Sequence, residues 1–531
     1  MWPDLQRALD RGAVIAYGAT PGWSAWLAAQ LAARELVVVV AADDAAAREL
    51  ETDIRFFIGR ERDATELDPI ASLPGIDVSP YADLSPDRSC IVERMATLYR
   101  LTRPELRPRL VVTSAEALAR RTMVPNQLTT RGLTIKQGDT IDRDQVAGLL
   151  VAGGWARTPV VDEPGTFALR GGVIDVYAPL APHPVRIELF GDEVESLRWF
   201  DAESQRTLRQ VTSVHLHPVR ETITTGTRDV RTRLREYADE IAHPTKATRR
   251  LIEQLEAGEV FVGIEGLTPA FHDEMVGPEL YMPADARWLV VDPDAARRTI
   301  DDLWRDAEQR YETREAKMLA FGPDRHFVTD LAAFKSARRI ELSTLEVHGD
   351  SDAERLRVEV DSLRVLRQEL DHARTFGDTE HVTPLLAAIK KWNELEMRIS
   401  IACDSQSRTD RLLGVLTARG VTVRTAAAGE PPMTQPGVTL ISGAPAHSFA
   451  SPKDRVALVT ASDIFGERVH HPSTKQKRAK DALLGGVSDW SQLAVGDYLV
   501  HQKHGVGRYH GLKKITVGKV DIDALHLEYD G

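Results

Sequence analysis

Short apolar runs rich in β-branched residues alternate with helix-patterned segments near the start of the chain, and this rhythm most constrains the fold. The runs lie at 13–18, 36–41 and 109–113. The helix-patterned segment WSAWLAAQLAARE separates the first two runs. Buried parallel strands read as continuous apolar runs because helices cover both faces of their sheet. The pattern therefore predicts an α/β unit built on a parallel sheet.

Three further regions carry their own patterns. Residues 170–190 contain RGGVIDVY and VRIELF, which predict strands of a small mixed module. The runs at 397–403, 438–442 and 456–460 predict strands of another small α/β unit. Residues 352–395 are charged and helix-patterned, and one apolar stripe recurs there at three- and four-residue spacing. Its members are Leu356, Val360, Leu363, Leu366 and Leu370. We expect this stripe to lie on one helix face and to pack against a neighbour.

The chain has 531 residues, which is too many for one hydrophobic core. We predict an α/β multidomain chain: a degenerate P-loop-like body with an inserted small α/β module, a second small α/β domain, and an incomplete small β-domain at the end. The end is expected to be incomplete because the chain stops directly after a strand-like run. The predicted parts are the body at 1–121 and 213–350, the inserted module at 122–212, a helical connector at 351–395, the small α/β domain at 396–466, a linker at 467–490 and the terminal β-domain at 491–531.

Composition excludes several classes of protein. The formal net charge is −12, which argues against a chain that coats nucleic acid, because phosphate affinity depends on Lys and Arg. Two cysteines cannot form a disulfide framework or a four-cysteine zinc site. No apolar run is long enough to span a bilayer, and the start of the chain lacks the features of a signal peptide. We therefore expect a cytoplasmic protein with no membrane partner.

The turn after the first apolar run occupies the place of a phosphate-binding loop. Gly18 and Gly22 supply glycines, and Trp23 and Ser24 follow. Such a loop needs a Lys for the β- and γ-phosphates and a Ser or Thr for magnesium. The Lys is missing here, and Trp23 is bulky where the backbone should approach the ligand closely. We expect this turn to be non-functional, so this chain should neither bind nor hydrolyse ATP and should need no cofactor.

Two other patterns suggest chemistry only weakly. Residues 160–163 (VVDE) resemble a Walker B strand, but Pro164-Gly165 turns the chain at once, and we expect a surface turn. The histidine pairs at 470–471 and 501–504 lie in a predicted linker and a predicted turn, where solvated or structural histidines are commoner than ligands. We expect neither a catalytic residue nor a metal site.

A series of ordered sequence blocks spans nearly the whole chain. The blocks are 84–87 (LSPD), 91–99 (IVERMATLY), 170–177 (RGGVIDVY), 186–198 (RIELFGDEVESLR), 200–207 (FDAESQRT), 462–468 (SDIFGER), 495–501 (VGDYLVH) and 504–509 (HGVGRY). Through these blocks the chain resembles the bacterial transcription-repair coupling factors, whose first domains are similar to the excinuclease B subunit. The chain departs from the excinuclease B subunit in two ways: the loop Lys is missing, and 81–91 leaves no room for that subunit's DNA-gripping hairpin.

The resemblance implies two protein partners. It implies that the module at 122–212 recruits the excinuclease A subunit through Arg170, Arg186 and Phe190. Arginine and aromatic residues dominate the energy of many interfaces. We expect two neighbouring strands to bring the two arginines onto one surface beside Phe190. The alternative is that Phe190 lies in the core and the arginines form ordinary surface ion pairs.

By the same resemblance, the terminal β-domain binds the β-subunit of RNA polymerase. Gln502 lies where the family places a usually apolar contact residue, and Lys503 follows it. Edge-strand pairing would supply backbone hydrogen bonds there. The family's motor domains, which use ATP and magnesium to move on double-stranded DNA, have no motif in these residues.

Three hypotheses therefore stand. The first is a non-catalytic adaptor for transcription-coupled nucleotide-excision repair. The second is an excinuclease-B-like repair ATPase, which the missing Lys in the turn at 18–25 disfavours. The third is a transcription regulator that binds only the polymerase, which would have no use for the Arg170/Arg186/Phe190 set.

Overall fold

The structure is a computed structural model of the chain. It describes residues 2–59, 67–82, 84–222, 227–256, 261, 263–315, 318–346, 353–375, 382–466, 498–501, 505–517 and 520–529. The chain divides into two units, Met1–Gly466 and Glu467–Gly531, and each is described by itself.

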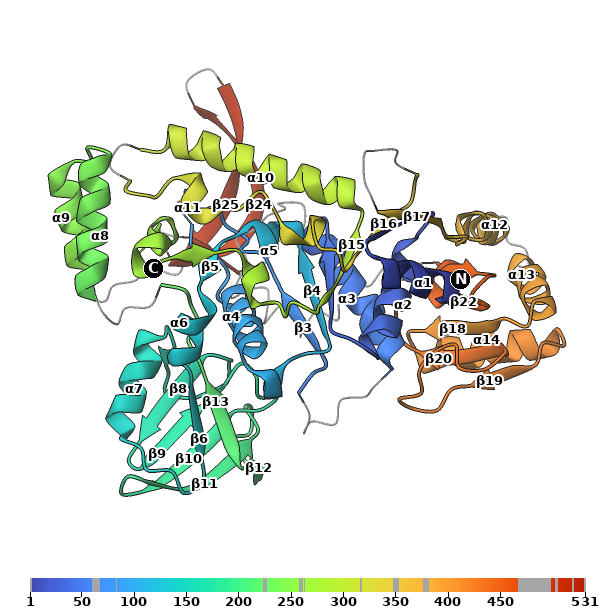
Figure 1. Ribbon diagram of the computed structural model, residues 1–531, viewed down its shortest axis with the longest axis horizontal. Helices are drawn as coiled ribbons and strands as arrows, with labels where there is room; N and C mark the ends of the chain where they lie inside the picture. Colours follow the sequence, from blue (N-terminus) through green and yellow to red (C-terminus); the bar gives the residue numbers. More distant parts are fainter. Residues whose placement is uncertain are drawn as a thin grey trace. The chain divides into compact units, whose positions relative to one another are not determined.

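Seven parallel strands from two distant parts of the chain form the largest sheet (Figure 1). Their order is β17-β1-β16-β15-β2-β4-β3. The strands are β1 (Val14–Tyr17), β2 (Val37–Ala41), β3 (Ile70–Leu73), β4 (Leu110–Ser114), β15 (Arg287–Val291), β16 (Arg339–Ser343) and β17 (Glu354–Arg357). The three apolar runs noted near the start of the chain are thus three parallel strands of one sheet, and β2 lies between β15 and β4.

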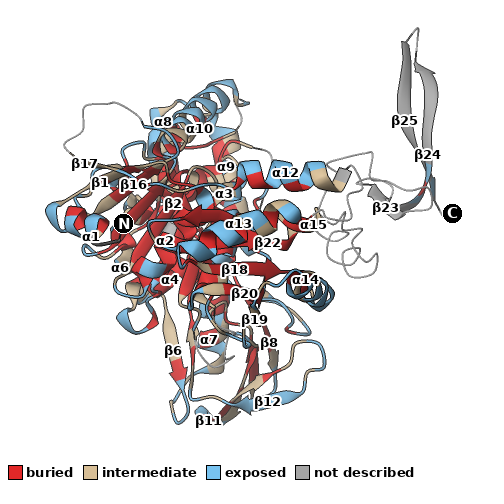
Figure 2. Cartoon of the chain, turned by 90° about the vertical axis from the view of Figure 1, so that its right-hand side faces the viewer, coloured by how far each residue is buried: buried red, intermediate tan, exposed pale blue. Residues whose placement is uncertain are grey.

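Strand β2 shows why this sheet is buried on both faces. All five of its residues are buried (Figure 2). Val37 and Val39 enter one core, whereas Val38 and Val40 enter another. Because successive side chains of a strand point to opposite faces, one core lies on each side of the sheet. The helices of this part are α1 (Trp2–Arg11), α2 (Pro21–Ala32), α3 (Asp44–Ile58), α4 (Arg88–Thr102), α5 (Ala115–Ala119) and α10 (Pro293–Thr313), with 3-10 helices η1 (Pro104–Leu106), η3 (Pro278–Tyr281) and η4 (Ala332–Phe334).

A six-stranded sheet, in the order β12-β11-β10-β9-β8-β7, forms the module inserted between β4 and β15. One of its faces packs with α7, β6 and β13 around a core that includes Trp155, Phe167 and Ile187. Strand β13 pairs with β6, so the module extends beyond the predicted boundary at 212. The elements are β5 (Thr122–Met123), α6 (Pro125–Thr130), β6 (Leu133–Lys136), α7 (Arg143–Ala152), β7 (Ala156–Arg157), β8 (Thr166–Arg170), β9 (Val173–Val176), β10 (Val185–Phe190), β11 (Glu193–Phe200), β12 (Thr207–Gln210) and β13 (Ser213–Leu216).

Helices follow the module before the chain returns to the large sheet. Their apolar residues form a separate core that includes Leu234, Leu267 and Phe321. The short strand β14 pairs with β5. The elements are α8 (Thr227–Glu240), α9 (Thr245–Glu256), η2 (Ile264–Phe271), β14 (Met275–Val276) and α11 (Pro323–His326).

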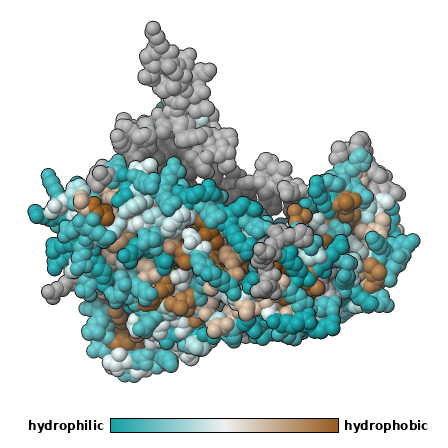
Figure 3. Space-filling view, turned by 45° about the horizontal axis from the view of Figure 1, so that its top comes forward, coloured by the Kyte–Doolittle hydropathy of each residue, from teal (hydrophilic) through white to brown (hydrophobic). Residues whose placement is uncertain are grey.

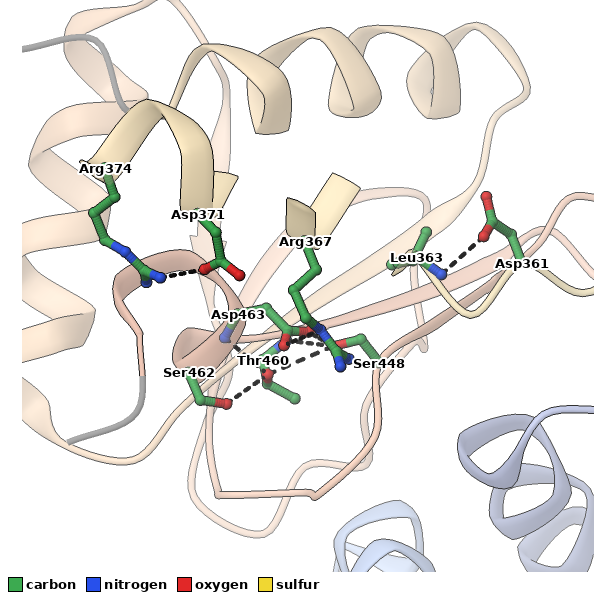
Figure 4. A network of polar contacts seen from close by, with 9 residues as sticks. All are labelled: Asp361, Leu363, Arg367, Asp371, Arg374, Ser448, Thr460, Ser462 and Asp463. Carbon is green, nitrogen blue, oxygen red and sulfur yellow. Dashed lines mark hydrogen bonds and ion pairs between the residues drawn. The ribbon is translucent and has the colours of Figure 1, made fainter. Parts of the chain in front are cut away.

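The second α/β domain is a five-stranded sheet in the order β19-β20-β18-β22-β21, with helices packed on it. Polar contacts join α12 to α15, the last helix of this domain. Arg367 on α12 pairs with Asp463 on α15 at 2.8 Å, and Ser448 forms hydrogen bonds with both Asp463 and Thr460 (Figure 4). The elements are α12 (Arg364–Thr375), α13 (Thr383–Glu394), β18 (Arg398–Cys403), α14 (Gln406–Ala418), β19 (Val423–Thr425), β20 (Gly437–Ser442), β21 (Phe449–Ser451), β22 (Val456–Thr460) and α15 (Ala461–Phe465).

The prediction of an α/β multidomain chain is confirmed, but the expected single helical stripe from Leu356 to Leu370 is wrong. Leu356 belongs to strand β17, which pairs with β1, so the body also extends beyond the predicted boundary at 350. Leu363, with a φ of 56°, precedes α12 and ends the extended segment. The stripe is divided between two cores: Leu356 packs on the body and Leu370 in the second α/β domain.

The second unit contains β23 (Tyr498–His501), β24 (Gly505–Val517) and β25 (Val520–Tyr529), which form an antiparallel sheet. The predicted linker at 467–490 lies outside the described residues. Among the residues that the structure describes, we find no helix with the length and apolarity that crossing a bilayer requires.

Candidate functional site

The turn that resembles a phosphate-binding loop connects β1 to α2, as predicted, but its residues serve packing. Gly18 has a φ of +86°, a conformation that glycine adopts without strain. Trp23 is only 1% exposed, and its indole Nε1 donates to Asp454 Oδ2 at 3.1 Å. The Ser24 hydroxyl donates to the carbonyl of Thr20 at 2.9 Å. The two side chains that follow Gly22 are therefore both occupied by protein atoms.

The second α/β domain covers this turn. A methyl group added to Gly22 would lie 2.9 Å from the carbonyl oxygen of His447. The Trp26 and Phe449 rings lie 6.4 Å apart, and Phe449 also contacts Phe57 edge to face at 6.2 Å. The space above the turn, where a nucleotide phosphate would have to approach, is filled by the chain itself.

A polar anchor beside the turn joins the two domains. Asp53 on α3 is fully buried, and it accepts hydrogen bonds from the Ala446 backbone N–H at 2.5 Å and from His447 Nδ1 at 2.8 Å. The hydrogen bond and charge of Asp53 raise the pKa of His447. Glu49 lies 3.7 Å from the other ring nitrogen of His447. The contact therefore combines an aromatic cluster with a partly buried ion pair.

The predicted protein-binding residues lie on the open face of the module sheet. Asp175, Arg186 and Arg198 are directly paired across β9, β10 and β11, so their side chains share a face. The intervening residues, such as Ile174 and Ile187, point into the core on the other face. This alternation is typical of an antiparallel sheet with one packed and one open side.

Arg186 is held by two neighbours on this face. Its Nε and Nη2 atoms donate to the two carboxylate oxygens of Asp175 at 2.8 and 2.9 Å. Its guanidinium carbon lies 4.8 Å from the centre of the buried Phe200 ring. The hydrogen bonds and charge of Asp175 raise the pKa of Arg186. Arg186 thus presents a fixed, fully charged guanidinium.

Phe190 is 78% exposed at the end of β10, so the alternative that it belongs to the core is wrong. Arg170 is exposed on β8, where its guanidinium donates to the carbonyl of Pro159. The expectation that the arginines stand on neighbouring strands is also wrong, because β9 separates β8 from β10. Both arginines nonetheless lie on the open face. Arg170 pairs with Val173, and Val173 pairs with Glu188. Glu188 is two residues from Arg186 on β10, so the side chains of these residues share one face.

Two charged residues of this face were not singled out from the sequence. Glu188 accepts from the Ser196 hydroxyl at 2.6 Å and pairs with Arg198 at 2.9 Å. Asp175 is only 3% exposed, and it stands between the apolar neighbours Ile174 and Val176. An acidic residue at an alternate position inside a strand-like run was the available signal. The 160–163 segment is a loop, as expected, although Val161 packs inward on Phe200.

The two residues predicted to bind the polymerase, Gln502 and Lys503, lie outside the described residues. In the neighbouring strands, Tyr509 is buried and His510 lies 2.6 Å from Glu528 across β24 and β25.

Comparison with known proteins gives two family-model matches. The UvrB interaction domain model matches residues 133–221, and the CarD-like/TRCF RID domain model matches residues 493–531. A transcription-repair-coupling factor of Myxococcus xanthus is 33% identical over 518 residues, which cover 94% of this chain and 42% of the relative. The chain is homologous to the N-terminal part of the transcription-repair coupling factors.

More distant coupling factors support the same relationship. The one from Escherichia coli (strain K12) is 27% identical over 517 residues, covering 95% of this chain and 42% of the relative. The one from Mycobacterium tuberculosis is 27% identical over 566 residues, covering 99% of this chain and 42% of the relative. The chain thus spans 42% of the length of these coupling factors. The resemblance read from the ordered blocks is confirmed, and the matched range 133–221 includes Arg170, Arg186 and Phe190.

Proposed function

We propose that this chain is the adaptor part of a transcription-coupled nucleotide-excision repair factor. Its inserted module, predicted at 122–212 and extended by β13, recruits the excinuclease A subunit to lesions where RNA polymerase is stalled. Its terminal β-domain binds the β-subunit of that polymerase, with contacts at Gln502 and Lys503. In the whole protein, ATP-driven translocation on double-stranded DNA in the cytoplasm belongs to other domains. The chain's own contribution is binding.

The observation that carries this proposal is the exposure of Phe190. The Phe190 ring is 78% exposed at the end of β10, the strand that also carries Arg186. Aromatic and arginine residues at the centre of an interface supply most of its binding energy. The face lies in the part that matches the UvrB interaction domain model, which supports a partner from excision repair. On the face of the molecule that Figure 3 shows, hydrophobic residues gather in small groups among hydrophilic ones.

The test is a calorimetric titration of the chain with the excinuclease A subunit. Wild-type chain should bind, and Phe190→Ala should weaken binding by about 2 kcal/mol or more, roughly 30-fold. Leu149→Ala is the matched control, because Leu149 is an exposed apolar residue of the same module on α7, which covers the opposite face. It should bind like wild type. Equal loss in both variants, or no binding by wild type, would remove the support for this function.

A further inference from the structure

We propose that Asp175 is a positioning residue of this binding face, which holds the Arg186 guanidinium in the orientation that the partner recognises. The inference rests on the proposed function and deepens it. Asp175 itself does not reach the partner, since only 3% of it is exposed. It acts through Arg186.

The hydrogen-bond geometry supports this role. Asp175 and Arg186 are directly paired residues of β9 and β10, so their side chains start on the same face. The carboxylate binds one edge of the guanidinium through Nε and Nη2 at 2.8 and 2.9 Å. A guanidinium has five N–H donors in a rigid planar fork, so three donors are not used by Asp175. The remaining edge can therefore bind a carboxylate or carbonyl of the partner.

The surroundings fix the position of the pair. The Phe200 ring lies under the guanidinium at 4.8 Å and belongs to a small cluster with Val161 and Ala168. Ala168 is also the residue that pairs with Asp175 on β8. Backbone pairing with β8 thus places Asp175, and Arg186 is held both by the Asp175 carboxylate and by the Phe200 ring. Its side chain remains 24% exposed.

Two effects of Asp175 on binding oppose each other. Its negative charge reduces the attraction between Arg186 and an acidic partner. Its hydrogen bonds, however, order a long side chain before binding, and ordering such a side chain only on binding reduces affinity. The ordering effect should win, because salt screens the attraction between Arg186 and a charged partner that approaches through solvent. Removal of the Asp175 charge should therefore lower affinity, about three- to tenfold.

The experiment is a double-mutant cycle in the full chain, titrated with the excinuclease A subunit. The proteins are wild type, Asp175→Asn, Arg186→Ala and the double variant, with circular dichroism and thermal melting of each. Asp175→Asn should weaken binding about three- to tenfold in the wild-type background and should have no further effect when Arg186 is already Ala. A merely structural role would give the same loss in both backgrounds and would overturn the inference. Unchanged or higher affinity of Asp175→Asn would overturn it too.

Further variants keep the result interpretable. Arg186→Lys retains an ion pair with Asp175 but lacks the planar fork, so it should lose affinity even if Asp175→Asn folds poorly; affinity equal to wild type would overturn the inference. Glu430→Gln is the matched control, because Arg424 and Glu430 form a similar two-bond pair at 2.8 Å in the second α/β domain. It should bind like wild type. If wild type fails to bind, or Phe190→Ala binds equally well, the proposed function fails; if only Asp175→Asn is silent, the inference alone fails.

Discussion

The turn at 18–25 and the open face of the module sheet each resemble a known binding site, yet the turn is buried whereas the module face is exposed. At the turn, Trp23 is 1% exposed and bonded to Asp454, and Gly22 lies against the backbone of His447. On the module face, Phe190 is 78% exposed. The first region is filled by the chain itself, whereas the second is exposed.

The turn lacks the Lys of a phosphate-binding loop, and its residues pack against the second α/β domain. Without a Lys, the turn has no charge to bind phosphate, and a buried aromatic ring stabilises the fold more than a vacant loop would. The module face keeps charged and aromatic groups in the open, where they contribute little to stability. Keeping side chains exposed therefore forgoes stability only on the module face. Substitutions at the turn and on the module face should have clearly different effects on the free energy of unfolding.

The largest expected effect is on stability at the turn. Trp23→Ala removes a fully buried indole and its bond to Asp454, so the free energy of unfolding should fall by about 3–5 kcal/mol. Denaturant titration measures it. The matched variant Phe190→Ala removes an exposed ring and should change stability by less than about 0.5 kcal/mol. A loss at Phe190 as large as at Trp23 would erase the contrast between the two regions.

A smaller effect concerns the pH dependence of the contact that covers the turn. Asp53 raises the pKa of His447 above the value of about 6.5 expected in the unfolded chain. The protonated pair therefore contributes fully below about pH 6.5, and its contribution is lost as pH rises through the higher folded pKa. His447→Asn can keep the hydrogen bond to Asp53 but does not titrate.

The stability difference between wild type and His447→Asn should thus be largest near pH 6 and should shrink towards pH 9. Denaturant midpoints across this range measure it. Asp53→Asn, which removes the charge from the other side of the pair, should flatten the pH dependence in the same way. A difference between wild type and His447→Asn that stays constant from pH 6 to pH 9 would show that the ion pair does not contribute.

Local patterns predicted much of the fold. The continuous apolar runs form buried parallel strands, because helices cover both faces of their sheet. The alternating segment VRIELF forms a strand with one buried face and one exposed face. The expectation of a helical region over 352–395 failed only at its start, because Leu356 completes an edge strand beside β1, whereas α12 and α13 lie in the rest. Periodicity within a segment does not report which distant strand will pair with it, and a tertiary contact overrode the local preference.

The candidate site was predicted less completely for a similar reason. Arg170, Arg186 and Phe190 came from matching blocks, and the structure puts them on one face. The roles of Asp175 and Phe200 depend on cross-strand register, which separate motifs do not define. The partner of Trp23 lies 431 residues further along the chain, and no local pattern connects the two residues.

The smallest expected effect is the absence of any effect of ATP on this chain. Trp23 stands between Gly22 and Ser24, the position that the Lys occupies in a phosphate-binding loop. Even a Trp23→Lys variant would direct its ammonium group towards Asp454 and beneath the second α/β domain, where His447 and Phe449 cover the turn. Calorimetry with ATP and magnesium should therefore give no binding tighter than about 1 mM, roughly −4 kcal/mol, for wild type or for this variant. ATP binding by the variant alone would mean that the second α/β domain does not block the turn, and that wild type lacks only the Lys needed for binding. ATP binding by wild type would contradict the contrast between the buried turn and the open module face, because the filled turn would then still act as a ligand site.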